Sequence, residues 1–303
     1  MTATRVRALL WMFGERRTSN EHRIANSSSW AALPLPVDQA TIPEACGHYP
    51  LGRDASLETS AITSRSRSAV HWRTTLNISN DLRARLLKPA FPRAATYDAE
   101  FLFDTWMGPN VLWLTEWATS ALPLQPGMRI LDLGCGKAAS SIFLAKEFGV
   151  TVWATDLWIA PADNLRRVEV TGLADRVLPV HAEAHALPFA AGYFDAIVSI
   201  DAYHYFGTDD LYLGYILKFL RPGGHLCVVA PGLHDELPDV PPDWLRPYWE
   251  WEFCSFHSPG WWRRHWSETG LVEIDCADTL EHGWQPDFYD PVSGRQAWHA
   301  GPV

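Results

Sequence analysis

Three acidic residues, each at the end of a short apolar stretch or just after one, are well suited to bind a ligand. Asp132 precedes the glycine-rich turn Gly134-Cys135-Gly136, and Asp156 follows that turn by about 20 residues. A carboxylate at the second position can accept two hydrogen bonds from a ribose diol. Glu183, after the next apolar stretch, offers an acceptor for an adenine amino group. Together the three acids predict a nucleoside site.

The glycine-rich turn indicates a close approach between backbone and ligand. Glycine tolerates positive φ and has no Cβ in the way, and a helix beginning near Ala138 would present free N–H groups. A GxG turn alone is weak support, so its value comes from Asp156 and Glu183 at the distances that follow.

The segment 199–206 contains the candidate catalytic residues. His204 can act as a general base near neutral pH, and Asp201 could orient it or bind an amine substrate. Tyr203 and Tyr205 are expected to shape the pocket rather than react. An alternative stays open in which His204 only packs within its own loop.

These residues need a scaffold of alternating strands and helices. After Pro126-Gly127 we expect strands at 129–133, 151–155, 177–181, 194–200 and 225–230, and helices at 138–148, 162–171 and 209–220. Short apolar strands separated by amphipathic helices predict a parallel sheet covered on both faces. Helices over 80–120, broken at Gly108-Pro109, are expected before it.

With these features in order, residues 128–231 resemble the class I S-adenosylmethionine-dependent methyltransferases. The resemblance rests on Leu131-Asp132-Leu133-Gly134-Cys135-Gly136, then 187–189 (LPF), 194–195 (FD) and 220–224 (LRPGG). The chain is further similar to a group of bacterial proteins related to ubiquinone-type and cyclopropane-synthase-type methylases. The resemblance implies an α/β, Rossmann-like, doubly wound, mostly parallel seven-stranded sheet with an aromatic-rich C-terminal insertion. The last strand of such a sheet is antiparallel, and the sequence after Glu281 shows no clear strand pattern for it.

The same resemblance implies the roles of individual residues toward S-adenosylmethionine. It assigns Asp132 and the turn to the methionine end, Asp156 to the ribose and Glu183 to the adenine. The complete implied set of cofactor-contacting residues is Tyr97, Asp132, Gly134, Cys135, Gly136, Asp156, Leu157, Glu183, Ala184 and Ser199. Ala138 departs from the family pattern, in which many relatives have a third glycine.

The residue pattern divides the chain into an N-terminal extension and one catalytic domain. Residues 1–75 lack a sustained period and contain serine-rich runs, so we expect a disordered or loosely ordered extension. The domain covers 80–303, with helices at 80–120, a core at 128–231, an aromatic-rich cap at 232–266 and last strands at 271–303. Ser258 with Pro259 predicts a helix start, and the many tryptophans here either cap a substrate or bury the helix.

Composition excludes several classes of protein. The five cysteines are scattered without a CxxC pair, so we expect neither a disulfide framework nor a metal site. Residues 91–303 carry 13 Lys and Arg against 28 Asp and Glu, which disfavours nucleic acid as a substrate. No apolar run suffices to cross a bilayer, so we expect a cytoplasmic protein without membrane insertion.

The leading hypothesis is methylation of N, O or S of a small molecule, with His204 as the base and the oligomeric state undetermined. Lipid C-methylation or cyclopropanation is one alternative, and a non-catalytic S-adenosylmethionine-binding protein is another. Burial of Tyr203 and His204 away from any cavity would favour the non-catalytic protein. A nucleic-acid methylase is the weakest alternative, because no NPPY-like motif follows the fourth strand.

Overall fold

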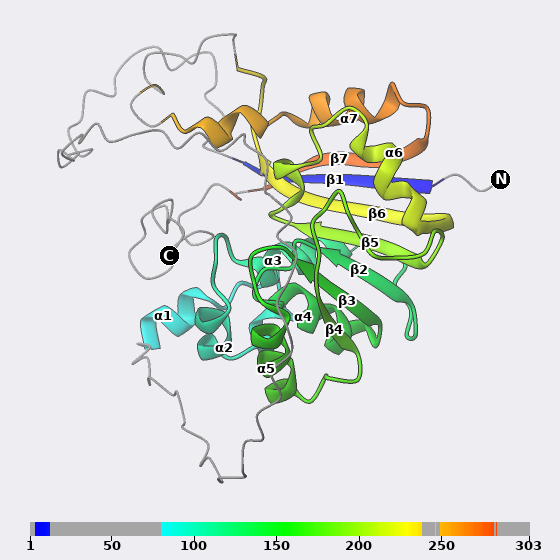
Figure 1. The fold of residues 1–303 in the computed structure, drawn as a ribbon. Helices are drawn as coiled ribbons and strands as arrows, with labels where there is room; N and C mark the ends of the chain where they lie inside the picture. The colour runs from blue at the N-terminus through cyan, green and yellow to red at the C-terminus, as the bar shows by residue number, and fades with distance from the viewer. Residues whose placement is uncertain are drawn as a thin grey trace, which may run out of the picture. The chain divides into compact units, whose positions relative to one another are not determined.

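Seven parallel strands form the central sheet of the protein (Figure 1). The computed structural model describes residues 4–12, 80–120, 122–237, 246, 249–281 and 283. The strands are β1 (Thr4–Met12), β2 (Arg129–Leu133), β3 (Thr151–Asp156), β4 (Val177–His181), β5 (Phe194–Ile200), β6 (Leu220–Gly232) and β7 (Val272–Leu280). Their order in the sheet is β4-β3-β2-β5-β6-β1-β7. The predicted α/β fold is confirmed.

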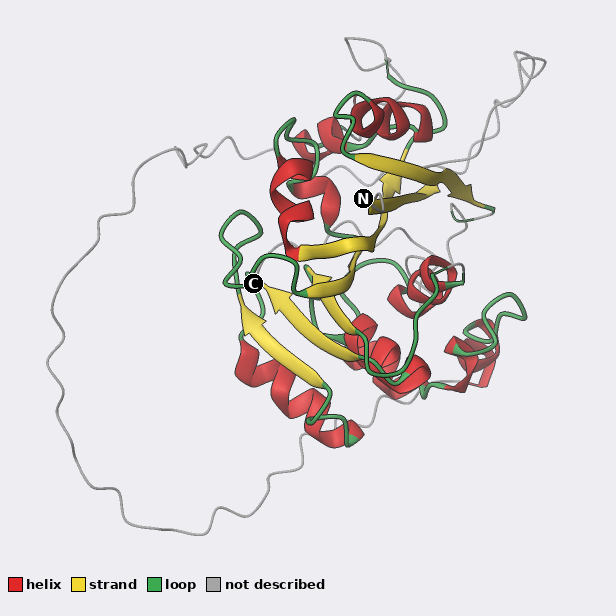
Figure 2. Cartoon of the chain, turned by 90° about the vertical axis from the view of Figure 1, so that its right-hand side faces the viewer, coloured by secondary structure: helices red, strands yellow, loops and turns green. Residues whose placement is uncertain are grey.

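Helices cover both faces of this sheet (Figure 2). They are α1 (Asn80–Arg85), α2 (Ala99–Asp104), α3 (Val111–Thr119), α4 (Ala139–Phe148), α5 (Pro161–Thr171), α6 (Tyr212–Ile216) and α7 (Pro259–Ser267). Ile130 packs into the core with α3 and α4, whereas its neighbour Leu131 packs into the core with α6 and α7. Because side chains alternate along a strand, a strand that is apolar at successive positions is buried on both faces.

Most predicted elements are found where the sequence places them, with one clear exception. The strands 177–181 and 194–200 have the predicted bounds, but the predicted helix 209–220 is reduced to α6 and the 3₁₀ turn Leu217–Phe219. The Asp209 carboxylate accepts a hydrogen bond from the Leu211 amide at 2.7 Å, which makes a turn where the helix was expected to begin. The strand predicted at 225–230 extends over 220–232.

Strand β1 corrects the expectation of disorder for residues 4–12. It lies between β6 and β7, and Val6 pairs with Leu226 on one side and Ile274 on the other. Val6 is fully buried. The seventh strand therefore comes from the N-terminal segment, and every neighbouring pair in the described sheet is parallel. Residues 13–79 and the region after 283 lie outside the described residues.

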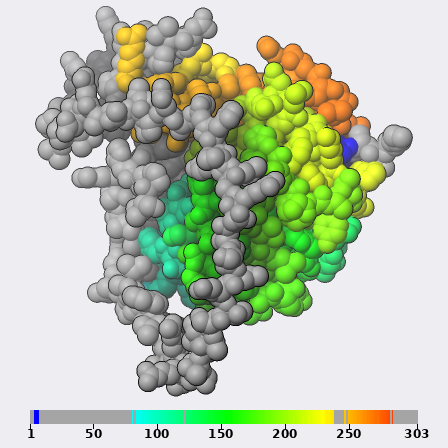
Figure 3. Space-filling view, viewed as in Figure 1, coloured from blue at the N-terminus to red at the C-terminus, as the bar shows by residue number. Residues whose placement is uncertain are grey.

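The aromatic-rich segment forms part of the core beside α6. Helix α7 begins as predicted, with the Ser258 hydroxyl accepting from the Trp261 amide at 3.2 Å and Pro259 in the first turn. Trp262 and Trp266 are buried against Tyr203. The orange α7 and β7 region lies next to the yellow-green α6 region (Figure 3). These two tryptophans therefore bury the helix and do not cap a substrate.

The part of the chain that the structure describes contains no helix with the length and apolar character of a membrane span.

Candidate functional site

The carboxyl ends of β2, β3, β4 and β5 border one cavity of about 330 Å³. A segment between α2 and α3 adds residues from the other side. The predicted site residues that line it are Gly134, Cys135, Gly136, Asp156, Leu157, Glu183, Ala184 and Asp201. The predicted site residues outside its lining are Tyr97, Asp132, Ser199, Tyr203 and His204. The structure thus brings most of the predicted cofactor residues together, but only one of the predicted catalytic residues.

The glycine-rich turn is held in a shape that only glycine permits. Gly134 has a φ of +74° and Gly136 a φ of +51°. A Cβ on Gly134 would lie 2.4 Å from the Cβ of Ala202, and one on Gly136 would lie 2.9 Å from Met107 Sδ. The turn therefore packs directly against the loop after β5 and leaves its cavity side open.

Ala138 is also left-handed, with a φ of +63° just before α4. This conformation suits glycine better than alanine. Alanine at position 138 therefore carries a backbone strain that the glycine of many relatives would avoid.

The amide groups of the turn bind strand β3, not the cavity. The Gly134 and Cys135 amides both donate to the Thr155 carbonyl at 2.9 Å, and the Gly136 amide donates to Asp156 Oδ2 at 2.8 Å. These three amides are therefore already paired within the protein, and the predicted free N–H groups belong to the start of the following helix, α4. The glycine-rich turn therefore shapes the wall of the cavity, and its three amides are bonded to β3.

Asp156 lines the cavity and accepts hydrogen bonds from three backbone amides in two segments. Besides Gly136, it accepts hydrogen bonds from the amides of Trp158 at 2.7 Å and Ile159 at 2.9 Å, both through Oδ1. Oδ1 accepts two of these hydrogen bonds and Oδ2 only one, so Oδ2 keeps acceptor capacity for a further donor. Asp156 can therefore hold its own loop in place and still accept from a ligand hydroxyl.

Glu183 faces the same cavity and is held by the residue two positions on. Its Oε1 lies 2.7 Å from His185 Nδ1, and its Oε2 accepts from the His185 amide at 2.9 Å. Burial alone would raise the pKa of Glu183, but these hydrogen bonds bring the pKa below its usual value. Glu183 is therefore an ionised acceptor at neutral pH.

Asp132 is buried beneath the turn and does not line the cavity. Its Oδ2 accepts from the hydroxyls of Ser140 at 2.6 Å and Ser141 at 2.5 Å. Burial raises the pKa of Asp132 to about 6, even though the two hydroxyl hydrogen bonds lower it. In this structure the acid fixes the first turn of α4, and its contact with the cofactor stays a prediction.

His204 and Tyr203 are buried away from the cavity. The His204 ring packs against Tyr205 and Phe256, and burial lowers its pKa to about 3. Tyr203 packs between Trp262 and Trp266. His204 thus has neither the access nor the proton affinity of a general base at neutral pH. The burial of both side chains away from the cavity favours the alternative of a non-catalytic protein.

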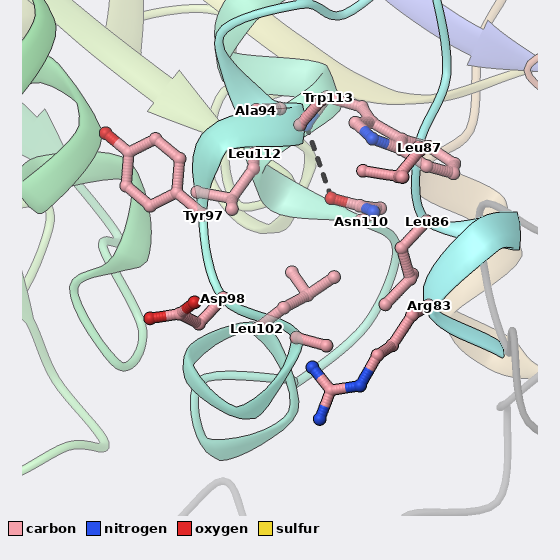
Figure 4. A pocket seen from close by; sticks show the side chains of 12 residues that line it. Arg83, Leu86, Leu87, Ala94, Tyr97, Asp98, Leu102, Asn110, Leu112 and Trp113 are labelled. Atoms are coloured by element: carbon pink, nitrogen blue, oxygen red, sulfur yellow. Dashed lines mark hydrogen bonds between the residues drawn. The ribbon is translucent and has the colours of Figure 1, made fainter. Parts of the chain in front are cut away.

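Ser199 and Tyr97 also lie outside the cavity lining. The buried Ser199 hydroxyl donates to the Leu133 carbonyl at 2.8 Å, which ties β5 to β2. Tyr97 lines a separate cavity of about 130 Å³ among the N-terminal helices, on the far side from Leu86 (Figure 4). Its hydroxyl donates to Glu147 Oε1 at 3.1 Å, so the implied closure of Tyr97 over a cofactor is not seen in this arrangement.

Asp201 lines the cavity in a left-handed conformation, with a φ of +59°. Its amide donates to the Val229 carbonyl at 2.8 Å, which holds this conformation at the end of β5. A Cβ on Gly108 would come within 2.8 Å of Asp201 Oδ2. Non-glycine residues with positive φ are uncommon and concentrate at functional sites, so Asp201 is the predicted catalytic residue that the geometry favours.

Sequence reasoning missed several residues of the lining, among them Met107, Gly108 and Trp158. The Gly108-Pro109 pair was visible only as a helix break. Trp158 follows Asp156 by two positions, and no local pattern distinguishes it from a surface aromatic residue.

Comparison with known families agrees with this architecture. A family model described as a methyltransferase domain matches residues 130–224. This region is a class I S-adenosylmethionine-dependent methyltransferase domain. The methyltransferase region contains the glycine-rich turn, Asp156 and Glu183, and therefore most of the cavity wall.

Similar curated proteins are methyltransferases by name. The chain is 30% identical over 186 residues to the 2-methyl-6-phytyl-1,4-hydroquinone methyltransferase of Synechocystis sp., covering 58% of each chain. It is 29% identical over 138 residues to the fatty-acid O-methyltransferase of Mycolicibacterium smegmatis, covering 44% of each. The chain thus spans 58% of the length of the first relative and 44% of the length of the second.

Among solved structures, similarity extends to phosphoethanolamine N-methyltransferase 2 of Haemonchus contortus. The sequence identity is 19% and the TM-score 0.44, with 62% of this chain and 44% of that chain covered. A geranyl diphosphate methyltransferase gives 24% identity and a TM-score of 0.44, with 51% and 58% covered.

Among the described residues, no group of three His, Cys, Asp or Glu side chains is arranged to hold a metal ion.

Proposed function

We propose that the chain binds S-adenosylmethionine in the cavity at the carboxyl edge of the sheet and transfers its methyl group to N, O or S of a small molecule. The observation that carries the proposal is the convergence of Asp156, Glu183 and the glycine-rich turn on one cavity. These groups come from three successive strand ends, so their meeting is a property of the fold.

The residues present fit the cofactor. Asp156 Oδ2 has acceptor capacity for a ribose hydroxyl, and the ionised Glu183 can accept from an adenine amino group. Leu157 and Ala184, next to these two acids, give apolar walls for the adenine ring. The glycine-rich turn lines the same cavity and is assigned to the methionine end.

When bound, the cofactor would supply a methyl carbon attached to a cationic sulfur. The acceptor atom bonds to this carbon as the carbon–sulfur bond breaks and its electrons go to sulfur. The proton of the acceptor atom is released to water. The protein mainly has to hold the acceptor near the methyl group and exclude competing water. Of the three predicted catalytic residues, Asp201 alone lines the cavity. It is our candidate for orienting the acceptor, and His204 is no longer proposed as the base.

A non-catalytic S-adenosylmethionine-binding protein is the second candidate. The burial of Tyr203 and His204 favours it, because the loop then offers no histidine to the acceptor. Methyl transfer needs few obligatory catalytic groups, however, and this keeps the enzyme as the leading proposal. Lipid methylation, a cytoplasmic location and the exclusion of nucleic acid stay predictions.

The test is isothermal titration of S-adenosylmethionine and S-adenosylhomocysteine into the purified full chain. We expect both to bind, and we expect Asp156→Ala to abolish binding because the ribose acceptor is lost. Asp163→Ala, which removes an acid from the first turn of α5 outside the cavity, is the matched control and should bind normally.

Circular dichroism checks that both variants are folded. Unchanged affinity in a folded Asp156→Ala variant contradicts the assigned pose. A screen of acceptors for S-adenosylhomocysteine release then separates the enzyme from the non-catalytic protein.

A further inference from the structure

Exposed apolar side chains gather at the mouth of the cavity. Ten large apolar or aromatic residues are exposed in the described part of the chain, and four of them line this one cavity. They are Met107 (48% exposed), Leu157 (48%), Trp158 (70%) and Tyr205 (47%). Such a concentration in a concave site marks a surface that an apolar ligand covers.

These side chains come from three segments that are distant in the sequence. Met107 precedes α3, Trp158 follows β3 and Tyr205 follows β5. The rings of Trp158 and Tyr205 meet edge to face, with centroids 5.7 Å apart and an interplanar angle of 67°. The fold thus builds an aromatic rim from separate loops, and Met107 adds a polarisable sulfur to it.

The rim is fixed relative to the proposed cofactor site. The Trp158 amide donates to Asp156 Oδ1 at 2.7 Å, so the residue that carries the ring is tied to the ribose-binding acid. This tie is made by the backbone and survives replacement of the ring. Binding at the rim can therefore be tested without removing the cofactor contact.

The charges around the rim disfavour an anionic ligand. The lining contains the carboxyl groups of Asp156, Glu183 and Asp201, and its lysine, Lys137, donates to the backbone carbonyls of Asp104 and Trp106. Burial, followed by the charges of Asp201 and Glu252, raises the pKa of Tyr205, so its ring is a neutral phenol. A carboxylate or phosphate on the acceptor would meet repulsion without a dedicated cation.

We propose that the methyl acceptor is an aromatic molecule without a negative charge whose ring packs against Trp158, Tyr205 and Met107. Aromatic rings gain more from such a rim than aliphatic chains do, through edge-to-face and sulfur–ring contacts beyond the area they bury. This inference rests on the proposed function, since it names the acceptor class of the same site.

The test titrates 2-naphthol and naphthalene-2-sulfonate, which share a ring system and differ in charge, into the full chain saturated with S-adenosylhomocysteine. We expect 2-naphthol to bind and the sulfonate to bind at least tenfold more weakly. Trp158→Ala and Tyr205→Ala should each weaken 2-naphthol binding roughly three- to tenfold, and Tyr205→Phe should keep it. Trp251→Ala removes an exposed ring outside the cavity and should change nothing.

The outcomes separate the two proposals. If wild-type protein fails to bind S-adenosylhomocysteine, the proposed function fails. If that ligand binds but 2-naphthol does not, or the sulfonate binds equally well, the acceptor class is wrong while the function stands. Ring removal with no more effect than Trp251→Ala also overturns the inference. Loss of S-adenosylhomocysteine affinity in Trp158→Ala would assign that ring to the cofactor instead.

Discussion

Two acids at equivalent places in the sequence pattern have different surroundings in the structure. Asp132 points to the hydroxyls of Ser140 and Ser141 under α4, whereas Asp156 lines the cavity and binds the loops around it. Both follow apolar strand residues, so spacing alone predicts a ligand contact for both. The difference arises from their place in the sheet: Asp132 pairs with Ala154 inside the sheet, whereas Asp156 is the last residue of β3.

His204 gives a prediction at the residue scale, since its burial affects stability more than chemistry. The pKa falls from 6.5 to about 3 on folding, so the unfolded chain takes up a proton between those values and the folded protein does not. Stability from this group is present above pH 6.5 and is lost as the pH falls. Asp132, with a pKa raised from 3.8 to about 6, has the opposite slope between those two values.

Comparison of wild type with His204→Gln cancels the Asp132 contribution, because both proteins keep that acid. Between pH 7 and pH 5, we expect the wild type to lose roughly 2 kcal/mol more free energy of unfolding than the variant. Urea unfolding at the two pH values measures this difference. Equal losses would show that His204 titrates normally in the folded protein.

At the scale of elements, the glycine-rich turn shows how packing decides what a position tolerates. Gly134 and Gly172 have nearly the same φ, +74° and +72°. A Cβ on Gly134 would lie 2.4 Å from Ala202, whereas nothing lies within 4 Å of a Cβ on Gly172. The two positions therefore share the backbone cost of alanine and differ in steric clash.

We expect Gly172→Ala to cost about 1 kcal/mol of stability, from the positive φ alone, and to leave S-adenosylhomocysteine affinity unchanged. Gly134→Ala should cost more and also weaken binding at least tenfold, because the turn must move away from the loop after β5. Urea unfolding and calorimetric titration measure the two effects. Equal behaviour of the two variants would refute the close packing of the turn.

The elements that sequence predicts well are those with a local signal. Apolar strands such as Val177–His181 and the capped start of α7 have the predicted positions, because burial and capping act within a few residues. The aromatic rim was predicted only in part. Tyr205 was expected to shape the pocket and lines it, whereas Met107 and Trp158 meet it only through the fold, and each resembles an ordinary surface residue in its own segment.

At the scale of the whole molecule, β1 links the C-terminal part of the domain to the rest of the sheet. Strand β7 pairs with β1, and β1 pairs with β6. This pairing joins residues more than 200 positions apart, as Arg5 and Asp275 do through an ion pair of 2.9 Å. A local reading of the first residues cannot show such a partner, so the sequence predicted an extension where the fold has a strand.

Val6→Asp tests this role, because it places a carboxylate at a fully buried position between β6 and β7. We expect a loss of at least about 3 kcal/mol in the free energy of unfolding and faster amide exchange over Val272–Leu280. Val170→Asp, the same substitution at an exposed position of α5, should change stability by about 0.5 kcal/mol or less. Unchanged exchange in a folded Val6→Asp variant would show that β7 is held without β1.

A crystal structure with S-adenosylhomocysteine would show whether the acids at the carboxyl edge of the sheet bind the cofactor. The adenosyl group should lie in the cavity, with its ribose hydroxyls on Asp156 and its adenine amino group on Glu183. A ligand bound elsewhere, or bound in the cavity without contact to either acid, would contradict the account.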